Sequence, residues 1–264
     1  MKSPRKVEYL KNRAGEVEFW EEHWHKQDVK KQVEQVEKDS VTLIVWGWIQ
    51  HATEERQNPR ILDGGCGTGR YLVYFGKLGY DIIGADNSAN AVRVAKNFDA
   101  NLKVVQASVL DLPFDSQSFD YYLSFGVLEH FIDGPEQGLR EAYRVLKKDG
   151  MLFVSVPFMN SLRLLEEHLW TLREKIFNKQ RAFEGDFYQY YFTKKEFKSI
   201  LCSLGLEVLK GHPINQELGL LRAMPFVRKN RFSNYLTLNL AKAIKLFLPW
   251  FSPHMVLFVC RKGS

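Results

Sequence analysis

Hydrophobic and polar positions between residues 60 and 157 follow two alternating patterns. Short apolar runs of strand length, such as Ile61-Leu62 before Asp63, precede longer stretches in which apolar residues recur every three or four positions. The predicted strands cover 60–63, 81–85, 102–106, 120–125 and 151–156. The predicted helices between them cover 68–78, 88–98 and 136–146. This alternation predicts a parallel sheet with helices on both faces and right-handed crossovers.

The sheet is expected to continue after an interruption. Thr193 is a predicted N-cap for a helix that ends at Gly205, and residues 206–209 form a short apolar run. A last apolar run, at 254–261, is expected to add an antiparallel strand. The predicted fold class is therefore α/β, with a Rossmann-like, mostly parallel sheet of seven strands whose last strand is antiparallel.

Three segments do not follow this rhythm. Residues 1–57 combine many charges with apolar residues at helical spacing, and they predict an N-terminal helical segment that ends before Pro59. Residues 158–191 and 211–253 are long insertions, and the first is rich in aromatic residues. We expect the N-terminal helices and the two insertions to form a cap over the core. The core then consists of residues 58–157, 192–210 and 254–261.

Composition excludes a few classes of protein. The 264 residues are 45% apolar and 26% charged, as in ordinary folded soluble proteins. The three cysteines, Cys66, Cys202 and Cys260, include no CxxC pair and support neither a disulfide framework nor a zinc site. The first residues have no apolar secretory core, and no uncharged apolar run reaches the roughly 18 residues of a spanning helix. We therefore expect a cytoplasmic protein without a metal site.

The glycine-rich stretch Arg60–Leu72 carries the clearest chemical signal. Four glycines within six positions, Gly64, Gly65, Gly67 and Gly69, separate a predicted strand from a predicted helix. Such a turn lets a ligand approach the backbone closely, and the helix start suits an anionic group. A phosphate-binding P-loop is excluded because no G-K-[ST] follows. A dinucleotide-dependent oxidoreductase is disfavoured because Arg70 occupies the place of the third glycine in G-x-G-x-x-G.

At this point the sequence resembles the class I S-adenosylmethionine-dependent methyltransferases of the small-molecule type with an "LPF…SFD" signature. The matching stretches are I-L-D-G-G-C-G-T-G at 61–69, D-N-S at 86–88, L-D-L-P-F-D-S-Q-S-F-D at 110–120, L-S-F-G-V-L-E-H-F at 123–131 and L-R-E-A-Y-R-V-L-K-K-D-G-M-L at 139–152. They follow the order and spacing of that family. The resemblance implies a transferase that binds S-adenosylmethionine, with residues 58–157 as the cofactor-binding methyltransferase core.

The resemblance also implies a set of cofactor-binding residues. Asp63 would receive the ammonium of the methionine moiety, Asp86 would accept hydrogen bonds from the ribose hydroxyls, and Phe125 would face the cofactor. Ser108 stands where the family often has an acidic residue that meets the adenine amine, which is a departure from the pattern. The complete set is Asp63, Gly65, Cys66, Gly67, Gly69, Asp86, Asn87, Ser108, Val109 and Phe125.

Two of these assignments have structural alternatives. Asp63 could instead bond to N–H groups of the turn, and Asp86 could be a plain helix-entry residue. Cys66 is expected to be a small turn residue rather than a nucleophile. His130, within the Glu129-His130 pair, is the candidate catalytic base, with a positioning role as the alternative.

The acceptor must be selected outside the core. The aromatic stretch 183–192, with His168 and Trp170, predicts a lid or pocket wall, and Trp20 and Trp24 could close over the cofactor. Residues 211–253 hold six basic residues and one acid, most of the net charge of +6. Within them, 232–251 is either an interfacial segment for peripheral membrane contact or a cap helix.

The predicted function is methyl transfer to a small-molecule or lipid-linked acceptor at oxygen or nitrogen. A non-catalytic S-adenosylmethionine-binding protein is the alternative, and an RNA or protein methyltransferase is less supported because no nucleic-acid module is present. The sequence leaves the acceptor, the pathway and the oligomeric state open.

Overall fold

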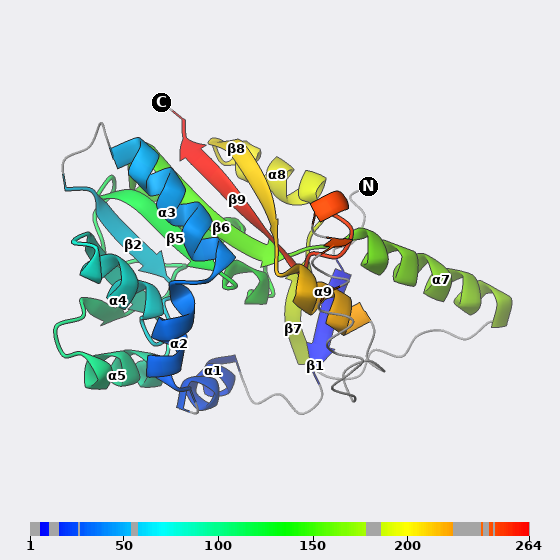
Figure 1. Cartoon of the computed structure of the whole chain (residues 1–264), viewed down its shortest axis with the longest axis horizontal. Helices are drawn as coiled ribbons and strands as arrows, with labels where there is room; N and C mark the ends of the chain where they lie inside the picture. Colours follow the sequence, from blue (N-terminus) through cyan, green and yellow to red (C-terminus); the bar gives the residue numbers. More distant parts are fainter. Residues whose placement is uncertain are drawn as a thin grey trace.

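A seven-stranded sheet forms the centre of the protein (Figure 1). The computed structural model describes residues 6–10, 16–25, 27–53, 58–177, 186–223, 239, 243–244 and 246–263. From one edge to the other the strands are β4 (Val104–Gln106), β3 (Asp81–Asp86), β2 (Arg60–Gly64), β5 (Phe119–Phe125), β6 (Leu146–Pro157), β9 (Met255–Lys262) and β8 (Leu206–Ile214). The strands from β4 to β6 are parallel neighbours, and β9 lies antiparallel between β6 and β8. The predicted fold class is confirmed.

Helices cover both faces of this sheet. Because successive side chains of a strand point to opposite faces, Tyr121 joins one hydrophobic cluster and Tyr122 joins the other. The first cluster includes residues of α2 (Val29–Val36), α3 (Ser40–Thr53), α4 (Arg70–Lys77) and α5 (Ala89–Phe98). The second includes residues of α6 (Glu136–Val145) and α8 (Lys194–Ser203). The Ser88 and Thr193 side chains cap α5 and α8 by accepting from Ala91 N–H and Glu196 N–H.

Several element boundaries differ from the sequence prediction. The helix α4 begins at Arg70 rather than at Thr68, because Gly69 still has a left-handed φ of 80°. The strand β6 begins at Leu146, directly after α6 ends, rather than at Met151. The strand β8 continues to Ile214 because β9 pairs with it along its whole length. The segment predicted to be an insertion from 211 onward is therefore partly sheet.

The N-terminal region and the first insertion meet in a second, two-stranded sheet. The strand β1 (Lys6–Leu10) pairs antiparallel with β7 (Asp186–Tyr191). The N-terminal segment is thus not purely helical as predicted, since it contains this strand as well as α1 (Glu16–His25), α2 and α3. The pairing joins residues about 180 positions apart, so it could not be predicted from a local sequence pattern.

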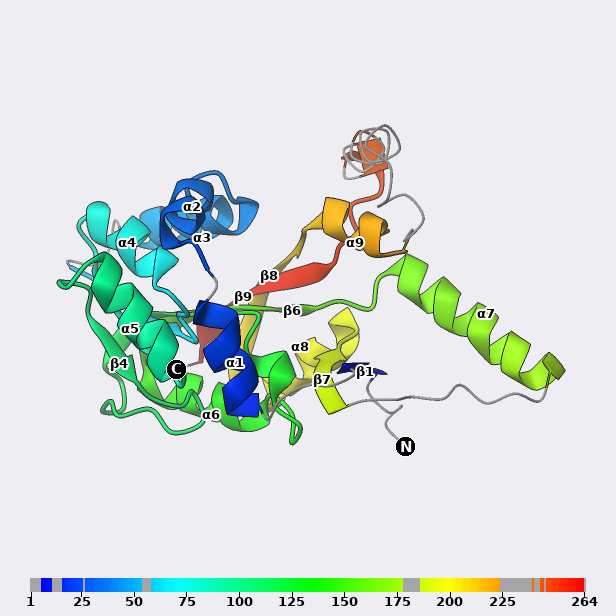
Figure 2. The same ribbon diagram turned by 90° about the horizontal axis from the view of Figure 1, so that it is seen from below.

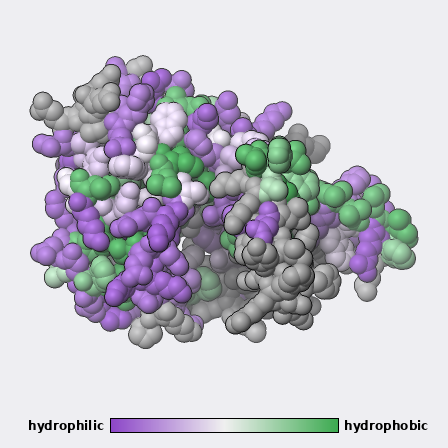
Figure 3. All heavy atoms as spheres, in the orientation of Figure 1, coloured by the Kyte–Doolittle hydropathy of each residue, from purple (hydrophilic) through white to green (hydrophobic). Residues whose placement is uncertain are grey.

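Two further helices lie at the side of the molecule. The helix α7 (Ser161–Phe177) projects away from the central sheet (Figure 2), and hydrophobic residues gather on it in the space-filling view (Figure 3). The helix α9 (Gln216–Ala223) follows β8. Most of the predicted interfacial segment 232–251 lies outside the described residues. None of the helices in the described ranges is long and apolar enough to span a membrane.

Candidate active site

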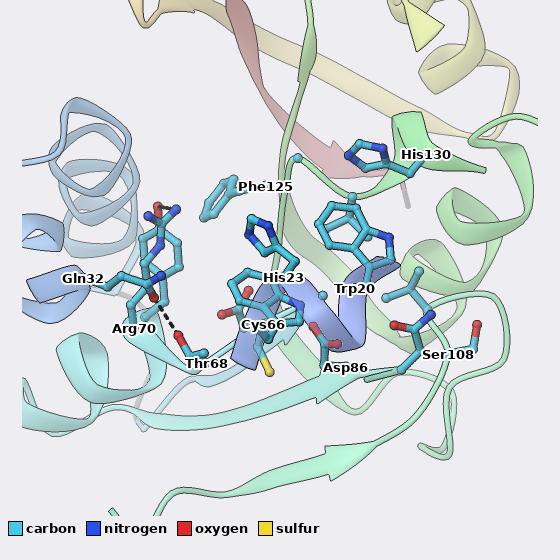
Figure 4. A pocket seen from close by; sticks show the side chains of 18 of the residues that line it. Trp20, His23, Gln32, Cys66, Thr68, Arg70, Asp86, Ser108, Phe125 and His130 are labelled. Atoms are coloured by element: carbon cyan, nitrogen blue, oxygen red, sulfur yellow. Dashed lines mark hydrogen bonds between the residues drawn. The ribbon is translucent and has the colours of Figure 1, made fainter. Parts of the chain in front are cut away.

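A cavity of about 290 Å³ opens at the carboxyl ends of the parallel strands (Figure 4). Its floor is formed by residues at the ends of three neighbouring strands. Asp63 in β2 is followed by Gly65, Asp86 in β3 is followed by Asn87, and Phe125 ends β5. The chain order reverses between β2 and β5, because β2 has β3 on one side and β5 on the other. Such a switch point is where open α/β sheets bind their ligands.

The glycine turn is shaped by three left-handed residues. Gly65, Gly67 and Gly69 have φ angles of 79°, 54° and 80°, a region that favours glycine. Gly65 N–H and Cys66 N–H both donate to the carbonyl of Ala85, at 2.7 and 3.1 Å, which ties the turn to the end of β3. Burial raises the pKa of the Cys66 thiol, so that this side chain stays neutral in the turn.

Asp63 is a buried carboxyl with an unused acceptor. Its Oδ2 atom has no hydrogen-bond partner in the described part of the chain, although the side chain lines the cavity. Burial raises the pKa of Asp63 to about 7, and the nearby positive charge of Arg70 opposes this rise. A buried carboxylate oxygen without a partner is costly, and a ligand ammonium would supply both the proton donor and the compensating charge.

Asp86 is held by the backbone on both of its oxygens. Gly67 N–H donates to Oδ2 at 2.8 Å and Ser88 N–H donates to Oδ1 at 3.0 Å. The side chain still lines the cavity, and each carboxylate oxygen has two lone pairs, so that acceptor capacity remains for ligand hydroxyls. The helix-entry contact to Ser88 and a ligand contact are therefore compatible.

The remaining predicted cofactor residues divide into two groups. Gly65, Cys66, Asn87, Ser108, Val109 and Phe125 line the cavity with the two aspartates. Gly67 and Gly69 do not line it. A Cβ at Gly67 would lie 2.5 Å from the Trp24 ring, and one at Gly69 would lie 3.1 Å from Leu72, so both positions lack room for a larger side chain.

Helix α1 closes the cavity with aromatic side chains at i, i+3 and i+4. Trp20, His23 and Trp24 line it, and the Trp20 ring stacks near Trp24 at a centroid distance of 6.2 Å. Figure 4 shows Trp20 between His130 and Asp86. The helix is fastened to α5, because Asn90 N–H donates to Glu21 Oε2 at 2.9 Å.

Sequence reasoning included the two tryptophans as possible closing residues and missed two neighbours. His23 lines the cavity, and burial lowers its pKa, so that the ring is neutral at pH 7. Gln32 lies at the edge of the same cavity and accepts a hydrogen bond from Thr68 Oγ1 at 2.6 Å. The helical spacing of His23 between Trp20 and Trp24 was the signal that could have identified it.

His130 lies in the cavity wall but is held by the protein on one side. Its Nδ1 lies 2.8 Å from the carbonyl oxygen of Tyr188. A carbonyl only accepts, so Nδ1 carries the proton and Nε2 is the basic nitrogen of the neutral ring. Nε2 lies 3.9 Å from Oε1 of Glu129, whose pKa burial raises to about 8. At pH 7 Glu129 is therefore mostly neutral and adds little negative charge beside the His130 ring.

The predicted aromatic wall is only partly present at the cavity. Residues 183–185 lie outside the described residues. Tyr188 contacts the His130 ring at a centroid distance of 4.9 Å, yet does not itself line the cavity. His168 and Trp170 lie on α7, apart from the cavity lining. In the part of the chain that the structure describes, no group of three or more His, Cys, Asp or Glu residues could hold a metal ion.

Comparisons with known proteins agree with this geometry. Residues 62–154 match the family model described as a methyltransferase domain. An uncharacterised protein of Methanocaldococcus jannaschii is 41% identical over 110 residues, which cover 41% of each chain. A ubiquinone/menaquinone biosynthesis C-methyltransferase of Rhizobium meliloti is 39% identical over 109 residues, which cover 38% of this chain and 42% of that protein. The matched region thus spans less than half of these relatives.

The fold has a solved counterpart as well. A structure of a SAM-dependent methyltransferase from Methanosarcina mazei superposes with a TM-score of 0.56 at 19% identity, covering 81% of this chain and 97% of that one. Orphaned Asp63, the left-handed glycine turn and the acid after β3 fit the ammonium, methionine chain and ribose of S-adenosylmethionine. The family match covers these same residues, so residues 62–154 belong to an S-adenosylmethionine-dependent methyltransferase domain, and the solved counterpart has the same fold.

Proposed function

We propose that this protein transfers the methyl group of S-adenosylmethionine to a small-molecule or lipid-linked acceptor, at oxygen or nitrogen. The observation that carries the proposal is the cavity itself. It has two buried carboxyls, Asp63 and Asp86, on its floor, and aromatic and histidine side chains from α1 and from residues 125–131 around the rest of its wall. The part of the cavity with the two aspartates suits the cofactor, and the part with the aromatic and histidine side chains suits an acceptor.

The cofactor would be held chiefly by the ends of β2 and β3. Asp63 would accept from its ammonium, Asp86 would accept from the ribose hydroxyls, and Asn87, Ser108 and Val109 would surround the adenine. When bound, S-adenosylmethionine supplies a methyl group already activated by the sulfonium. The chain therefore has to align the acceptor and exclude water rather than activate a leaving group.

Proton removal from the acceptor would fall to a histidine. In the neutral form of His130, Nε2 is the basic nitrogen because Nδ1 donates to Tyr188, and burial lowers the pKa of His23, which favours its neutral form at pH 7. An oxygen acceptor needs such a base, whereas an unprotonated amine does not. His130→Gln is expected to lower kcat for a hydroxyl acceptor by about 10²-fold while leaving the affinity for S-adenosylhomocysteine unchanged.

The enclosure of the cavity favours a small acceptor. The helix α1 covers it, and of the described residues that line it, Arg70 is the one arginine or lysine. A nucleic-acid substrate would need several cations for its phosphates. A lipid-linked acceptor is supported by the exposed side chains of Leu246, Phe247 and Leu248, which belong to the predicted interfacial segment.

Two measurements test the proposal in sequence. Calorimetry should show binding of S-adenosylmethionine and S-adenosylhomocysteine, with a large loss for Asp86→Ala; binding of neither would refute the cofactor assignment. Release of S-adenosylhomocysteine should then be measured with phenols, amines, carboxylates and polyprenyl-linked compounds as candidate acceptors. Samples of tRNA and protein extracts should be tested in the same assay. Binding without turnover on any arm would favour the non-catalytic alternative.

The lipid arm has its own control. Sedimentation with anionic vesicles should carry down the wild-type protein but less of Phe247→Glu, with Leu43→Glu on α3 as a matched exposed site. Equal recovery in the supernatant with and without vesicles would remove the lipid-linked acceptor and leave the small-molecule one.

A further inference from the structure

Helix α7 stands apart from the rest of the fold. It runs away from the central sheet (Figures 1 and 2). It has 17 residues, and none of their side chains is buried. Its first turn is bonded to the body, where Leu162 N–H donates to the carbonyl of Phe251 at 3.4 Å and the Arg163 guanidinium lies 3.2 Å from His254 Nδ1. A helix of this length without a buried side chain indicates a surface that binds a partner.

The apolar side chains of α7 form a narrow seam. Leu162, Leu165, Leu169, Leu172 and Ile176 follow one another at intervals of three and four residues. The last four are 54%, 57%, 42% and 72% exposed. At 100° per residue they cover an arc of about 80°, narrower than the stripe of about 100° or more that faces a globular core. A strict alternation of three and four is the spacing of a coiled-coil seam.

Charged residues border the seam on both sides and restrict its partner. Glu166 and Arg173 lie along one border, and His168 and Lys175 lie along the other. In an antiparallel pair, the border with Glu166 and Arg173 meets the same border of the other copy. Glu166 of each copy then lies beside Arg173 of the other. In a parallel pair, the border with Glu166 and Arg173 meets the opposite border of the other copy, so that Arg173 lies beside His168. Only the antiparallel pair is attractive, and twofold symmetry gives that attraction twice.

We propose that α7 is a dimerisation helix and that its occupant is the α7 of a second copy of this chain, in antiparallel orientation. In this pairing Leu165 packs against Ile176 of the other copy, and Leu169 packs against Leu172. The seam covers just over two heptads, so the dimer is weak and its population depends on protein concentration. The active-site cavity lies elsewhere, so the dimer does not depend on the methyltransferase assignment.

Light scattering with size-exclusion chromatography, on the full chain from about 1 to about 200 μM, measures the dimer directly. The wild-type mass should rise toward that of two chains. Leu169→Glu should raise the dissociation constant at least about tenfold. Leu164→Glu is the matched control, because Leu164 is 50% exposed on the same helix but lies off the seam, and it should change the constant by less than about twofold. All variants should keep the wild-type melting temperature, since the seam is outside the core.

Charge exchange tests the orientation. Glu166→Arg and Arg173→Glu should each weaken the dimer, and the double exchange should restore it. A tighter dimer with Arg173→Glu alone would indicate parallel pairing and overturn the antiparallel assignment. A monomer at every concentration, or equal effects of Leu164→Glu and Leu169→Glu, would overturn the dimer. Binding of phosphatidylcholine–phosphatidylglycerol vesicles by a monomer, lost in Leu169→Glu, would overturn it in favour of a lipid surface.

Discussion

Replacing Asp63 by asparagine should have opposite effects on stability and on ligand binding. Burial raises the pKa of this carboxyl from 3.8 to about 7 in the folded protein. Above pH 7 the folded protein must therefore hold a charge that the unfolded chain carries freely in water. The shift from 3.8 to about 7 corresponds to about 4 kcal/mol, which is the upper limit of the destabilisation.

The pH dependence of stability follows from the sign of this shift. A group with a raised pKa in the folded state stabilises the fold below its unfolded pKa, and that contribution is lost as the pH rises through the folded value. Asp63→Asn abolishes this titration. Its free energy of unfolding should exceed that of the wild type by at least about 1 kcal/mol at pH 8, and the difference should shrink as the pH falls from 7 toward 4. Urea unfolding at a series of pH values measures it.

Asp63→Asn should lower the affinity for the ligand, although it raises the stability of the fold. In the proposed site the ammonium of S-adenosylhomocysteine would compensate the Asp63 carboxylate, and a hydrogen bond of this charged kind is worth about 1.5–3 kcal/mol, or about 10- to 100-fold in affinity. Asp63→Asn should therefore weaken S-adenosylhomocysteine, while 5′-methylthioadenosine, which lacks the amino acid moiety, should bind the variant and the wild type alike. Calorimetry with both ligands compares them. Equal losses for both ligands, or a variant less stable than the wild type at pH 8, would refute this role of Asp63.

Four further substitutions test the local geometry of the site and the titration of Glu129. Gly67→Ala and Gly79→Ala both place a Cβ at positive φ, which should destabilise the fold by about 1–2 kcal/mol each. The new Cβ at Gly67 would also lie 2.5 Å from the Trp24 ring, whereas the one at Gly79 meets no atom within 4 Å. Calorimetry should therefore show weaker cofactor binding for Gly67→Ala and unchanged binding for Gly79→Ala. Trp24→Ala should weaken cofactor binding without altering the melting temperature by more than a few degrees, because the ring covers the turn from α1. Glu129→Gln should stabilise the protein at pH 9 and progressively less toward pH 5, because burial raises the pKa of Glu129 to about 8; a melting-temperature difference that does not vary with pH would contradict this.

The cofactor half of the site could be predicted because its residues are close in sequence. Strand, turn and helix follow one another from Arg60 to Lys77, so the glycine spacing and the position of Asp63 are visible in a single stretch. Asp86 follows the next strand by the same logic. The mostly parallel sheet and the antiparallel β9 followed from the alternation of patterns and from general rules of α/β folds, whereas the strand order was not predicted.

The aromatic half could not be predicted to the same depth. Trp20, His23, Phe125 and His130 come from segments more than 100 residues apart, and their meeting depends on the fastening of α1 to α5 through Glu21 and Asn90. The short pairing of β1 with β7 likewise joins the two ends of the peripheral region. Single-sequence patterns report local periodicity, so long-range contacts of this kind leave no trace in them.

This division between local and long-range residues has a consequence for specificity. The acceptor proposed above would face side chains whose positions are set by α1 and by the contact between His130 and Tyr188 of β7, rather than by the glycine turn. Changes in the peripheral segments can therefore alter the acceptor pocket while the backbone hydrogen bonds that hold Asp86 and the turn stay in place. The same peripheral insertion contains both β7, whose Tyr188 orients His130, and α7, which carries the seam. If the proposed acceptor site and the proposed dimer are correct, one inserted segment contributes to both of them.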